Sequence, residues 1–334
     1  MQLDVGFERS ATRLSKTLRL GDSTFSSSIG LEDDPPQGSD FGYWWHRYLR
    51  GTSPEPSAQI GELKVAELFC GPGGLAQGVK QFCREVGLGF NSVAAVDTDK
   101  RAVDVYVANH GTTPEFVRSG PEGDLANLVE HEVYDVAEDA RFLVPPWIKD
   151  EAWDALGDGA GIDLLLAGPP CQGHSNLNNH TRRNDLRNLS YLDVPAVAVA
   201  LGCPTVIMEN VQAVVHDRHQ VVSTTRRLFE AAGYTVTSAV LHAGSMGWPQ
   251  NRSRFFLVAS ALNTPISLES VGRQLTVDEG PLDLWWAISD LEDMTEDEHH
   301  MFRQANRTAE NRERIEYLFD HDVHDLPDHQ RPPC

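Results

Sequence analysis

The sequence predicts an α/β fold with a doubly wound, mainly parallel sheet. Between residues 64 and 260, short apolar runs of strand length alternate with segments of helical periodicity. This alternation is typical of a parallel sheet that carries helices on both faces. Several of the apolar runs also end in a glycine-rich turn or an acidic residue, and open α/β sheets bind their ligands at the carboxyl ends of strands.

The strands are recognised as short apolar runs bounded by turn residues. They are expected at residues 65–69, 92–96, 162–167, 204–208, 235–241 and 254–260. The third strand in chain order is expected either at 115–118 or at 132–136, within an irregular acidic region. Helical patterns cover residues 76–86, 100–109, 221–232, 282–291 and 306–319.

Composition divides the chain into three expected parts. Residues 1–60 are rich in Ser, Gly, Pro and Asp and read as a low-complexity extension. Residues 61–262 form the α/β domain, and 263–334 form a C-terminal extension with a looser pattern. The aromatic segment 42–50 must bury its rings. It is either a short helix packed on the body of the chain or a docking segment for a partner or nucleic acid.

The overall composition limits the classes of function. No apolar run approaches the roughly 20 residues of a membrane span, and the N-terminus lacks the apolar core of a signal peptide. Five cysteines without a CxxC pair argue against a disulfide framework and a zinc site, and favour the cytoplasm. The net charge of −21, from 28 basic and 49 acidic residues, argues against an extended basic surface, so any nucleic-acid contact depends on local arginines.

Cys171 follows a buried strand, Gly168 and two prolines. The prolines end the strand because they fix φ and supply no ladder donor. The thiol is therefore delivered on a stiff loop at the carboxyl end of a strand. A structural cysteine would more often lie inside the strand as a small hydrophobic residue, so a reactive thiol and a structural one both remain open from this stretch alone.

A cofactor site is indicated by the first strand and its turn. Three glycines follow Phe69 within Cys70–Leu75, where the backbone can approach a ligand and a helix N-terminus favours negative charge. The turn is neither GxGxxG nor a phosphate-binding P-loop. Asp97 ends the next strand, at the position where an acid binds ribose in related folds. The glycine turn and Asp97 together favour a nucleoside cofactor over a tight turn that has no ligand.

Two further groups complete the candidate site. Glu209 ends the strand expected to neighbour that of Cys171, and it is either a helix cap or a group that protonates or holds a heterocycle. Arg252 and Arg254 alternate by two residues and so share one side of an extended chain. They are either solvated or a clamp for a base or phosphate.

These segments resemble four motifs of the DNA (cytosine-5) methyltransferases. The matching residues are 67–74 (ELFCGPGG), 168–173 (GPPCQG), 209–211 (ENV) and 250–254 (QNRSR), in the order of that family. The resemblance is strong over about residues 64–260. It implies the Rossmann-like sheet of S-adenosylmethionine-dependent methyltransferases and makes residues 61–262 the catalytic domain.

The resemblance implies that S-adenosylmethionine binds at the first turn. Phe69 would stack on the adenine, and Asp97 would bind the ribose hydroxyls. The amides around Gly71–Leu75 would take the methionine carboxylate, with Asp124 or Asp135 at the adenine amino group. The full expected cofactor set is Phe69, Gly71, Gly73, Gly74, Leu75, Asp97, Asp135 and Pro169.

The resemblance also implies a covalent reaction on a cytosine flipped out of double-stranded DNA. Cys171 would attack C6, Glu209 would hold N3 of the ring, and Arg254, with Arg252, would support the flipped base. After Cys171, a loop with arginines would contact the DNA. Its expected DNA-binding residues are Gln172, Ser175, Arg182, Arg183 and Arg187, together with Gln250.

Three departures from the family pattern are visible. Glu67 stands where the family usually has Asp, and Met246-Gly247-Trp248 replaces Tyr-Gly-Val. No Gly-Asn-Ala-Val segment follows, so residues 263–334 are expected to be the start of an incomplete target-recognition region. The favoured interpretation is the catalytic part of a split or truncated enzyme of a restriction-modification or defence system. A second polypeptide would supply target recognition and the last motifs of the family, and the isolated chain is expected to methylate little or nothing. The alternative is a non-catalytic DNA- or partner-binding member of such a complex, and an RNA substrate stays open.

Overall fold

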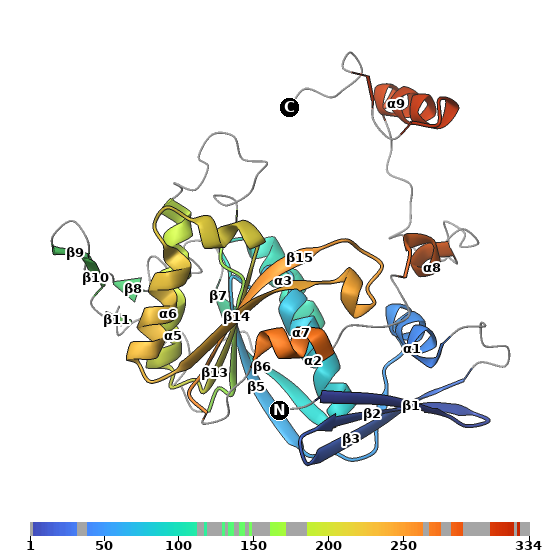
Figure 1. Ribbon diagram of the computed structural model, residues 1–334, viewed down its shortest axis with the longest axis horizontal. Coiled ribbons are helices and arrows are strands. Elements are labelled where there is room, and N and C mark those ends of the chain that lie inside the picture. Colours follow the sequence, from blue (N-terminus) through green and yellow to red (C-terminus); the bar gives the residue numbers. More distant parts are fainter. Residues whose placement is uncertain are drawn as a thin grey trace. The chain divides into compact units, whose positions relative to one another are not determined.

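The computed structural model describes residues 3–31, 39–111, 117–118, 129–130, 133–136, 140–143, 147–148, 161–171, 186–262, 267–274, 282–289, 308–323 and 326–327. The chain divides into two compact units, Met1–Asp283 and Leu284–Cys334. The first unit contains both an N-terminal sheet and a larger central sheet (Figure 1). The expected division at residues 60 and 262 stays a prediction.

The central sheet has seven strands in the order β14-β15-β13-β12-β5-β6-β7. In chain order these are β5 (Gly61–Leu68), β6 (Leu88–Val96), β7 (Val117–Arg118), β12 (Leu164–Ala167), β13 (Thr205–Asn210), β14 (Thr235–His242) and β15 (Ser253–Ser260). All neighbouring strands pair in parallel except β15, which is antiparallel to both β13 and β14. The predicted mainly parallel sheet is therefore confirmed, and of the two expected third strands the one at 117–118 joins it.

Helices cover both faces of this sheet (Figure 1). One face carries α2 (Gly74–Val86) and α3 (Lys100–His110); the other carries α5 (Asp193–Ala200) and α6 (Val221–Ala231). Along β5, Val65 and Ala66 point to opposite faces because strand side chains alternate. Val65 packs in the core beneath α2 and α3, and Ala66 packs in the core that includes α5 and α6 residues. Both faces are thus buried, as a doubly wound sheet requires.

The strand order reverses between β5 and β12. From β5 the chain continues to β6 on one side, whereas β12 lies on the other side and pairs with Val65–Leu68 of β5. Such a switch point opens a crevice at the carboxyl ends of the strands. In this protein the crevice lies between the turn after Leu68 and the loop after Ala167, which are the two segments expected to carry the cofactor and the thiol.

The N-terminal residues correct the expectation of a low-complexity extension. They form an antiparallel sheet of β1 (Leu3–Arg9), β2 (Arg13–Leu20), β3 (Ser23–Gly30) and β4 (Glu55–Pro56). Leu14 and Ile29 are buried at 0% and 4% exposure, and they face each other across β2 and β3. The apolar residues alternate with serines and arginines on the solvent side, so the composition alone resembled a disordered leader.

The aromatic segment forms helix α1 (Asp40–Leu49) on this sheet. Ser39 caps the helix by accepting a hydrogen bond from the amide of Gly42. Tyr43 and Trp44 are buried at 3% and 2% exposure in the core that contains Leu14. Of the two interpretations of this segment, packing on the body of the chain is the one that the structure shows.

The remaining elements are short. In the first unit they are β8 (Val129–Glu130), β9 (Val133–Val136), β10 (Ala140–Leu143), β11 (Trp147–Ile148), α7 (Leu268–Gln274) and the 3-10 helices η4 (Leu186–Leu192), η5 (Gln212–His216) and η6 (Gly244–Met246). The second unit contains α8 (Leu284–Ile288) and α9 (Ala309–Asp320). Both of its helices lie within segments that have the predicted helical pattern.

Candidate active site

The turn between β5 and α2 has a backbone that few side chains permit. Phe69, Gly71 and Gly73 have φ values of 54°, 51° and 91°. A Cβ atom on Gly73 would lie 2.3 Å from Nε2 of His110, which hydrogen-bonds with the Gly73 carbonyl at 3.2 Å. Glycine is therefore required at position 73 for both backbone angle and space. The turn leaves the N-terminus of α2 at the crevice, where its amide groups favour an anionic ligand.

Asp97 fixes this turn from the neighbouring strand. One carboxylate oxygen accepts a hydrogen bond from the amide of Gly71 at 2.9 Å, and the other accepts from the amide of Asp99 at 2.8 Å. An ionised carboxylate has about four lone-pair positions, so two remain for further donors. Asp97 is thus placed to hold the turn and to accept bonds from a diol in the crevice.

Glu67 is an unusual buried acid beneath the turn. Its side chain is 2% exposed, and Oε2 has no hydrogen-bond partner. The carboxyl group hydrogen-bonds with the Ala76 amide and with Tyr106, whose hydroxyl lies 3.1 Å from that of Ser92. Burial raises the pKa of Glu67 to about 8, with a smaller contribution from the nearby Asp97. The acid is therefore largely protonated at neutral pH, although it lines the crevice.

The loop that carries Cys171 is tied to the strand that carries Glu209. Asn210 is 1% exposed and donates a hydrogen bond of 3.1 Å from its side-chain amide to the Pro169 carbonyl. Its side-chain oxygen accepts from the amide of Val211 at 2.8 Å. Because β12 and β13 pair in parallel, this contact fixes the direction in which the chain leaves β12. Cys171, two residues further on, is a half-buried free thiol.

Glu209 forms an ion pair with Arg254. Nε of Arg254 lies 2.8 Å from Oε1 of Glu209, and both side chains are 24% exposed. Burial raises the pKa of Glu209, while Arg254 and then Arg252 oppose this shift. The effect of burial is the larger one. Glu209 is thus a carboxyl group that holds a proton more readily than an exposed glutamate does.

Part of this set lines a cavity of about 590 Å³, whereas Asp97, Gly73 and Asn210 are not among its lining residues. Phe69, Gly71, Gly74 and Leu75 of the cofactor turn line it together with Glu209, Gln250, Arg252 and Arg254. Gly168 also lines it, three residues before Cys171, whereas the buried Pro169 and Cys171 are not among the lining residues. A site of this volume suits a small organic ligand with a few convergent polar groups.

The remaining predicted site residues fall into two groups. Gln172, Ser175, Arg182, Arg183 and Asp124 lie outside the described residues. Arg187 is in η4 and Asp135 is in β9, but their side chains are not described. β9 pairs with β10 in a separate two-stranded sheet, so Asp135 does not belong to the third strand of the central sheet. The roles expected for all seven residues stay predictions.

Several residues at the site were not expected from the sequence. Asn210 had no assigned role. Leu241 lines the cavity from β14, and Met246 and Trp248 line it from the connection between β14 and β15. The sequence did contain a signal for Asn210. Side chains alternate along a strand, so Asn210 points away from Glu209, and a side-chain amide that becomes buried there needs a hydrogen-bond partner. The signal for Trp248 was weaker. It consisted only of the replacement of the usual Tyr-Gly-Val by Met246-Gly247-Trp248.

The described residues fit a nucleoside cofactor with a charged amino-acid tail. The turn forms a cradle that a Cβ on Gly73 would fill. Asp97 retains acceptor capacity, and the partnerless Oε2 of Glu67 adds a polar atom beneath the cradle. Within the same described ranges no group of three or more His, Cys, Asp or Glu side chains is arranged to hold a metal ion. None of the helices described is long and apolar enough to span a membrane.

The strand order and the crevice beside β5 are those of a doubly wound, Rossmann-like sheet. The sequence profile of the C-5 cytosine-specific DNA methylases matches residues 63–324. This chain belongs to the C-5 cytosine-specific DNA methylase family. S-adenosylmethionine is the methyl donor of the family and the cofactor of this chain.

Individual proteins are similar to this chain over part of their length. Type II methyltransferase M1.BsuMI of Bacillus subtilis (strain 168) is 34% identical over 283 residues, which are 84% of this chain and 61% of that protein. Type II methyltransferase M.NlaIV of Neisseria lactamica is 28% identical over 61% of this chain and 43% of its own length. The chain thus spans less than two thirds of each. The solved Dnmt2 methyltransferase of S. pombe has a TM-score of 0.45 at 18% identity, covering 67% of this chain and 57% of that one.

Proposed function

We propose that this chain carries out the methyl transfer of a DNA (cytosine-5) methyltransferase in a restriction-modification or defence system. The observation that supports this most is the shared cavity, in which the cofactor turn meets Glu209, Arg252 and Arg254 beside the Cys171 loop. The relatives named as Type II methyltransferases support the biological setting. A cytoplasmic location, expected from the cysteines, accompanies this proposal.

In this proposal the turn after β5 holds S-adenosylmethionine, which supplies an activated methyl group. Phe69 would stack on the adenine and Asp97 would accept hydrogen bonds from the ribose hydroxyls. The amides of Gly74 and Leu75, at the N-terminus of α2, would bind the methionine carboxylate, whereas the Gly71 amide is already donated to Asp97.

Cys171 is the proposed nucleophile. Its thiolate adds to C6 of a flipped cytosine, forming a C–S bond and shifting the ring electrons toward C5. Glu209 holds a proton at N3, which lowers the cost of the negative charge that develops in the ring. C5 would then take the methyl group, and the bound cofactor would be left as S-adenosylhomocysteine. Loss of the C5 proton to water or another base re-forms the ring double bond and expels the Cys171 thiolate, so the nucleophile is restored.

The electrostatics of Glu209 suit this role. Burial raises the pKa of Glu209, which favours the protonated carboxyl group that can donate to N3. Arg254 holds the carboxyl group in place through the 2.8 Å contact, and Arg252 adds positive charge nearby. Together the two arginines also offset the charge that accumulates on the base during the attack.

Covalent trapping tests the proposed function. DNA in which 5-fluorocytosine replaces cytosine cannot lose the C5 substituent as a proton, so the Cys171 adduct should accumulate in the presence of S-adenosylmethionine. The use of fully substituted genomic DNA removes the need to know the target sequence. We expect an adduct with the wild-type chain, none with Cys171→Ser, and at least about 100-fold slower trapping with Glu209→Gln.

The two variants need a control for cofactor binding. Cofactor affinity of Cys171→Ser and Glu209→Gln, measured by calorimetry, should stay within about twofold of wild type, since neither residue belongs to the cofactor turn. A wild-type chain that is reconstituted with the second polypeptide proposed below, and that binds S-adenosylmethionine and DNA yet forms no adduct, would overturn the catalytic proposal. That result would favour the non-catalytic DNA-binding alternative.

We further propose that a second polypeptide contributes to target recognition. The net charge of −21 leaves this chain poor in basic surface for DNA. The chain also spans less than two thirds of its relatives. Sequence-specific methylation of double-stranded DNA should then need the added polypeptide. Robust sequence-specific methylation by this chain alone would contradict the idea, and methylation of RNA in preference to DNA would change the substrate.

A further inference from the structure

Helix α1, which packs on the N-terminal sheet, contacts the connection between β14 and β15. This connection lines the 590 Å³ cavity of the candidate active site. The rings of Trp45 and Trp248 have their centroids 4.9 Å apart, with an interplanar angle of 56°. Trp248 lines the cavity together with Gln250 and Arg252 of the same connection, residues 243–252. An N-terminal side chain is thus one contact away from the candidate active site.

Helix α1 provides a fixed support for this contact. Trp44 is 2% exposed, and its ring centroid lies 5.9 Å from that of Phe7 in β1. Successive helical residues point about 100° apart. Trp44 therefore anchors the helix in the core of the N-terminal sheet, while Trp45, the next residue, reaches Trp248.

The N-terminal sheet is also fastened to α2, the helix that begins at the cofactor turn. Nζ of Lys16 lies 2.7 Å from a carboxylate oxygen of Glu85, and these side chains are 14% and 11% exposed. Tyr48 of α1 hydrogen-bonds with Gln77 of α2. The same N-terminal element therefore contacts two walls of the cavity, the cofactor helix and the 243–252 connection.

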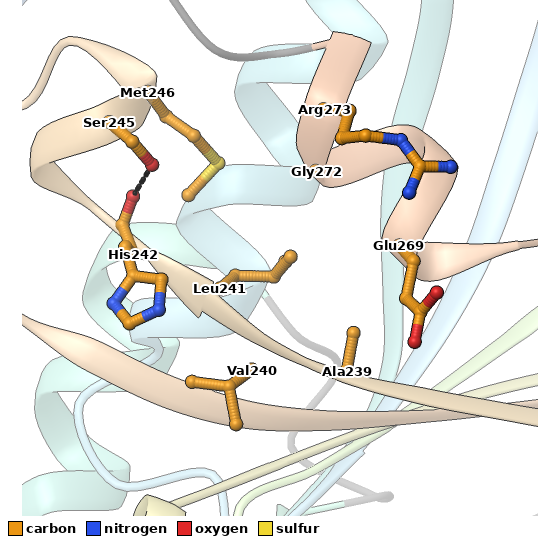
Figure 2. A pocket seen from close by; sticks show the side chains of 9 residues that line it. All are labelled: Ala239, Val240, Leu241, His242, Ser245, Met246, Glu269, Gly272 and Arg273. Carbon is orange, nitrogen blue, oxygen red and sulfur yellow. Dashed lines mark hydrogen bonds between the residues drawn. The ribbon is translucent and has the colours of Figure 1, made fainter.

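Part of the connection also lines a second cavity, of about 370 Å³. Ser245 and Met246 of the connection line it together with Glu269 and Arg273 of α7 (Figure 2). Met246 lines both cavities. Inside the connection, the amide of Trp248 donates to the Ala243 carbonyl at 3.1 Å. The connection is thus held by its own backbone hydrogen bonds and by the packing of Trp248 on Trp45 of α1.

We propose that Trp45 is a positioning residue of the candidate active site. Its contact with Trp248 holds residues 243–252 so that Gln250 and Arg252 remain at the cavity. The large indole of Trp248 stands where the family motif usually has a smaller residue, and it supplies the surface that α1 contacts. The effect on catalysis rests on the proposed function, whereas the effect on the connection does not.

Hydrogen exchange tests the contact without any assay of activity. In Trp45→Ala, the amides of residues 243–252 should exchange at least about threefold faster, because the connection loses a packing partner. Exchange in α6 should be unchanged. Trp285→Ala removes an exposed indole from α8 and should leave the 243–252 connection as in wild type. Unchanged exchange of the connection in both Trp45→Ala and Trp248→Ala would overturn the proposal.

Trapping kinetics on 5-fluorocytosine DNA test the positioning role. Trp45→Ala should raise the DNA concentration for half-maximal trapping by about tenfold and slow trapping at saturating cofactor, with cofactor affinity within twofold. Trp45→Phe should restore most of the rate. Trp248→Ala should match Trp45→Ala, and the double variant should add little.

The outcomes separate this inference from the proposed function. If Trp45→Ala lowers cofactor affinity, trapping and thermal stability in parallel, the residue serves general folding and the positioning role is wrong. If the wild-type chain forms no adduct but exchange in residues 243–252 still rises in Trp45→Ala, the proposed function fails and the positioning contact stands.

Discussion

Glu67 is the residue whose chemistry departs most from that of a surface acid. It is 2% exposed, and burial raises its pKa to about 8. As the pH rises above about 4.5, the carboxyl group ionises in the unfolded chain but stays protonated in the folded one until about pH 8. The folded state therefore binds more protons in this window and loses stability as the pH increases.

Replacement of Glu67 by Gln should flatten this dependence. The amide keeps the shape of the protonated acid and cannot ionise, so the stability of Glu67→Gln should fall less than that of wild type between pH 5 and 8. The measurement is the free energy of urea unfolding across this range. Glu8→Gln, at an exposed position of β1, is the control and should keep the wild-type slope. Equal slopes in all three proteins would show that Glu67 is ionised when folded.

Asn210 contacts the loop that carries Cys171 through its hydrogen bond to the Pro169 carbonyl. Asn210→Ala should remove both buried hydrogen bonds and cost about 1–3 kcal/mol of unfolding free energy, because the Pro169 carbonyl loses its donor. Adduct formation by Cys171 should slow by more than this loss of stability explains, while cofactor affinity stays within about twofold. Asn109→Ala, at an exposed position of α3, is the control. Wild-type trapping by folded Asn210→Ala would show that the loop holds its position without the amide.

At the scale of elements, the cofactor turn depends on glycine for two independent reasons. Gly73 has a φ of 91°, and its missing Cβ leaves room for the ring of His110. Gly73→Ala should therefore weaken S-adenosylmethionine binding by at least about tenfold, because α2 must shift at its N-terminus. Calorimetric titration of the cofactor measures this change.

The same helix offers a matched control. Gly78 is exposed in α2, and a Cβ there meets nothing within 4 Å. Gly78→Ala should leave cofactor affinity unchanged and raise stability by about 0.5–1 kcal/mol, since alanine is the better helix former. Equal cofactor affinity in Gly73→Ala and Gly78→Ala would contradict the importance of the turn.

At the scale of the molecule, the N-terminal sheet and the central sheet belong to one compact unit. The amide of Leu3 donates to Oε1 of Gln274 in α7 at 2.5 Å, and Lys16 pairs with Glu85 in α2. A Cβ on Gly87 would lie 1.8 Å from the Ala58 carbonyl oxygen, so the two backbones approach closely. We therefore expect the two sheets to unfold together.

Leu14→Ala tests this cooperation. Leu14 is fully buried in the N-terminal sheet, so its truncation should cost about 2–5 kcal/mol. The loss should appear in one transition whether unfolding is followed by near-ultraviolet circular dichroism or by loss of cofactor binding. Leu262→Ala, at a position 53% exposed, should change stability little. Two separate transitions, with cofactor binding retained after the first, would show that the sheets fold independently.

The sequence by itself determined the central sheet and the candidate residues at its edge. Strand and helix periods predicted β5, β6, β12, β13, β14 and β15 and the helices α2, α3 and α6, because each of these elements buries a face with a regular repeat. Helix α5, which is buried on nearly all sides, was not predicted. The sequence also singled out the glycine turn, Glu209 and the two arginines as a candidate site, since glycine at a strand end and charge after an apolar run are local signals.

The tertiary structure alone decided what depends on contacts between distant segments. The N-terminal sheet escaped prediction because its short alternating strands are rich in serine and become ordered by pairing and by packing on α1 and α2. The raised pKa of Glu67, the Asn210–Pro169 bond and the Trp45–Trp248 contact also arise from residues far apart in the chain. Their physical cause is burial and proximity, which a linear sequence does not report.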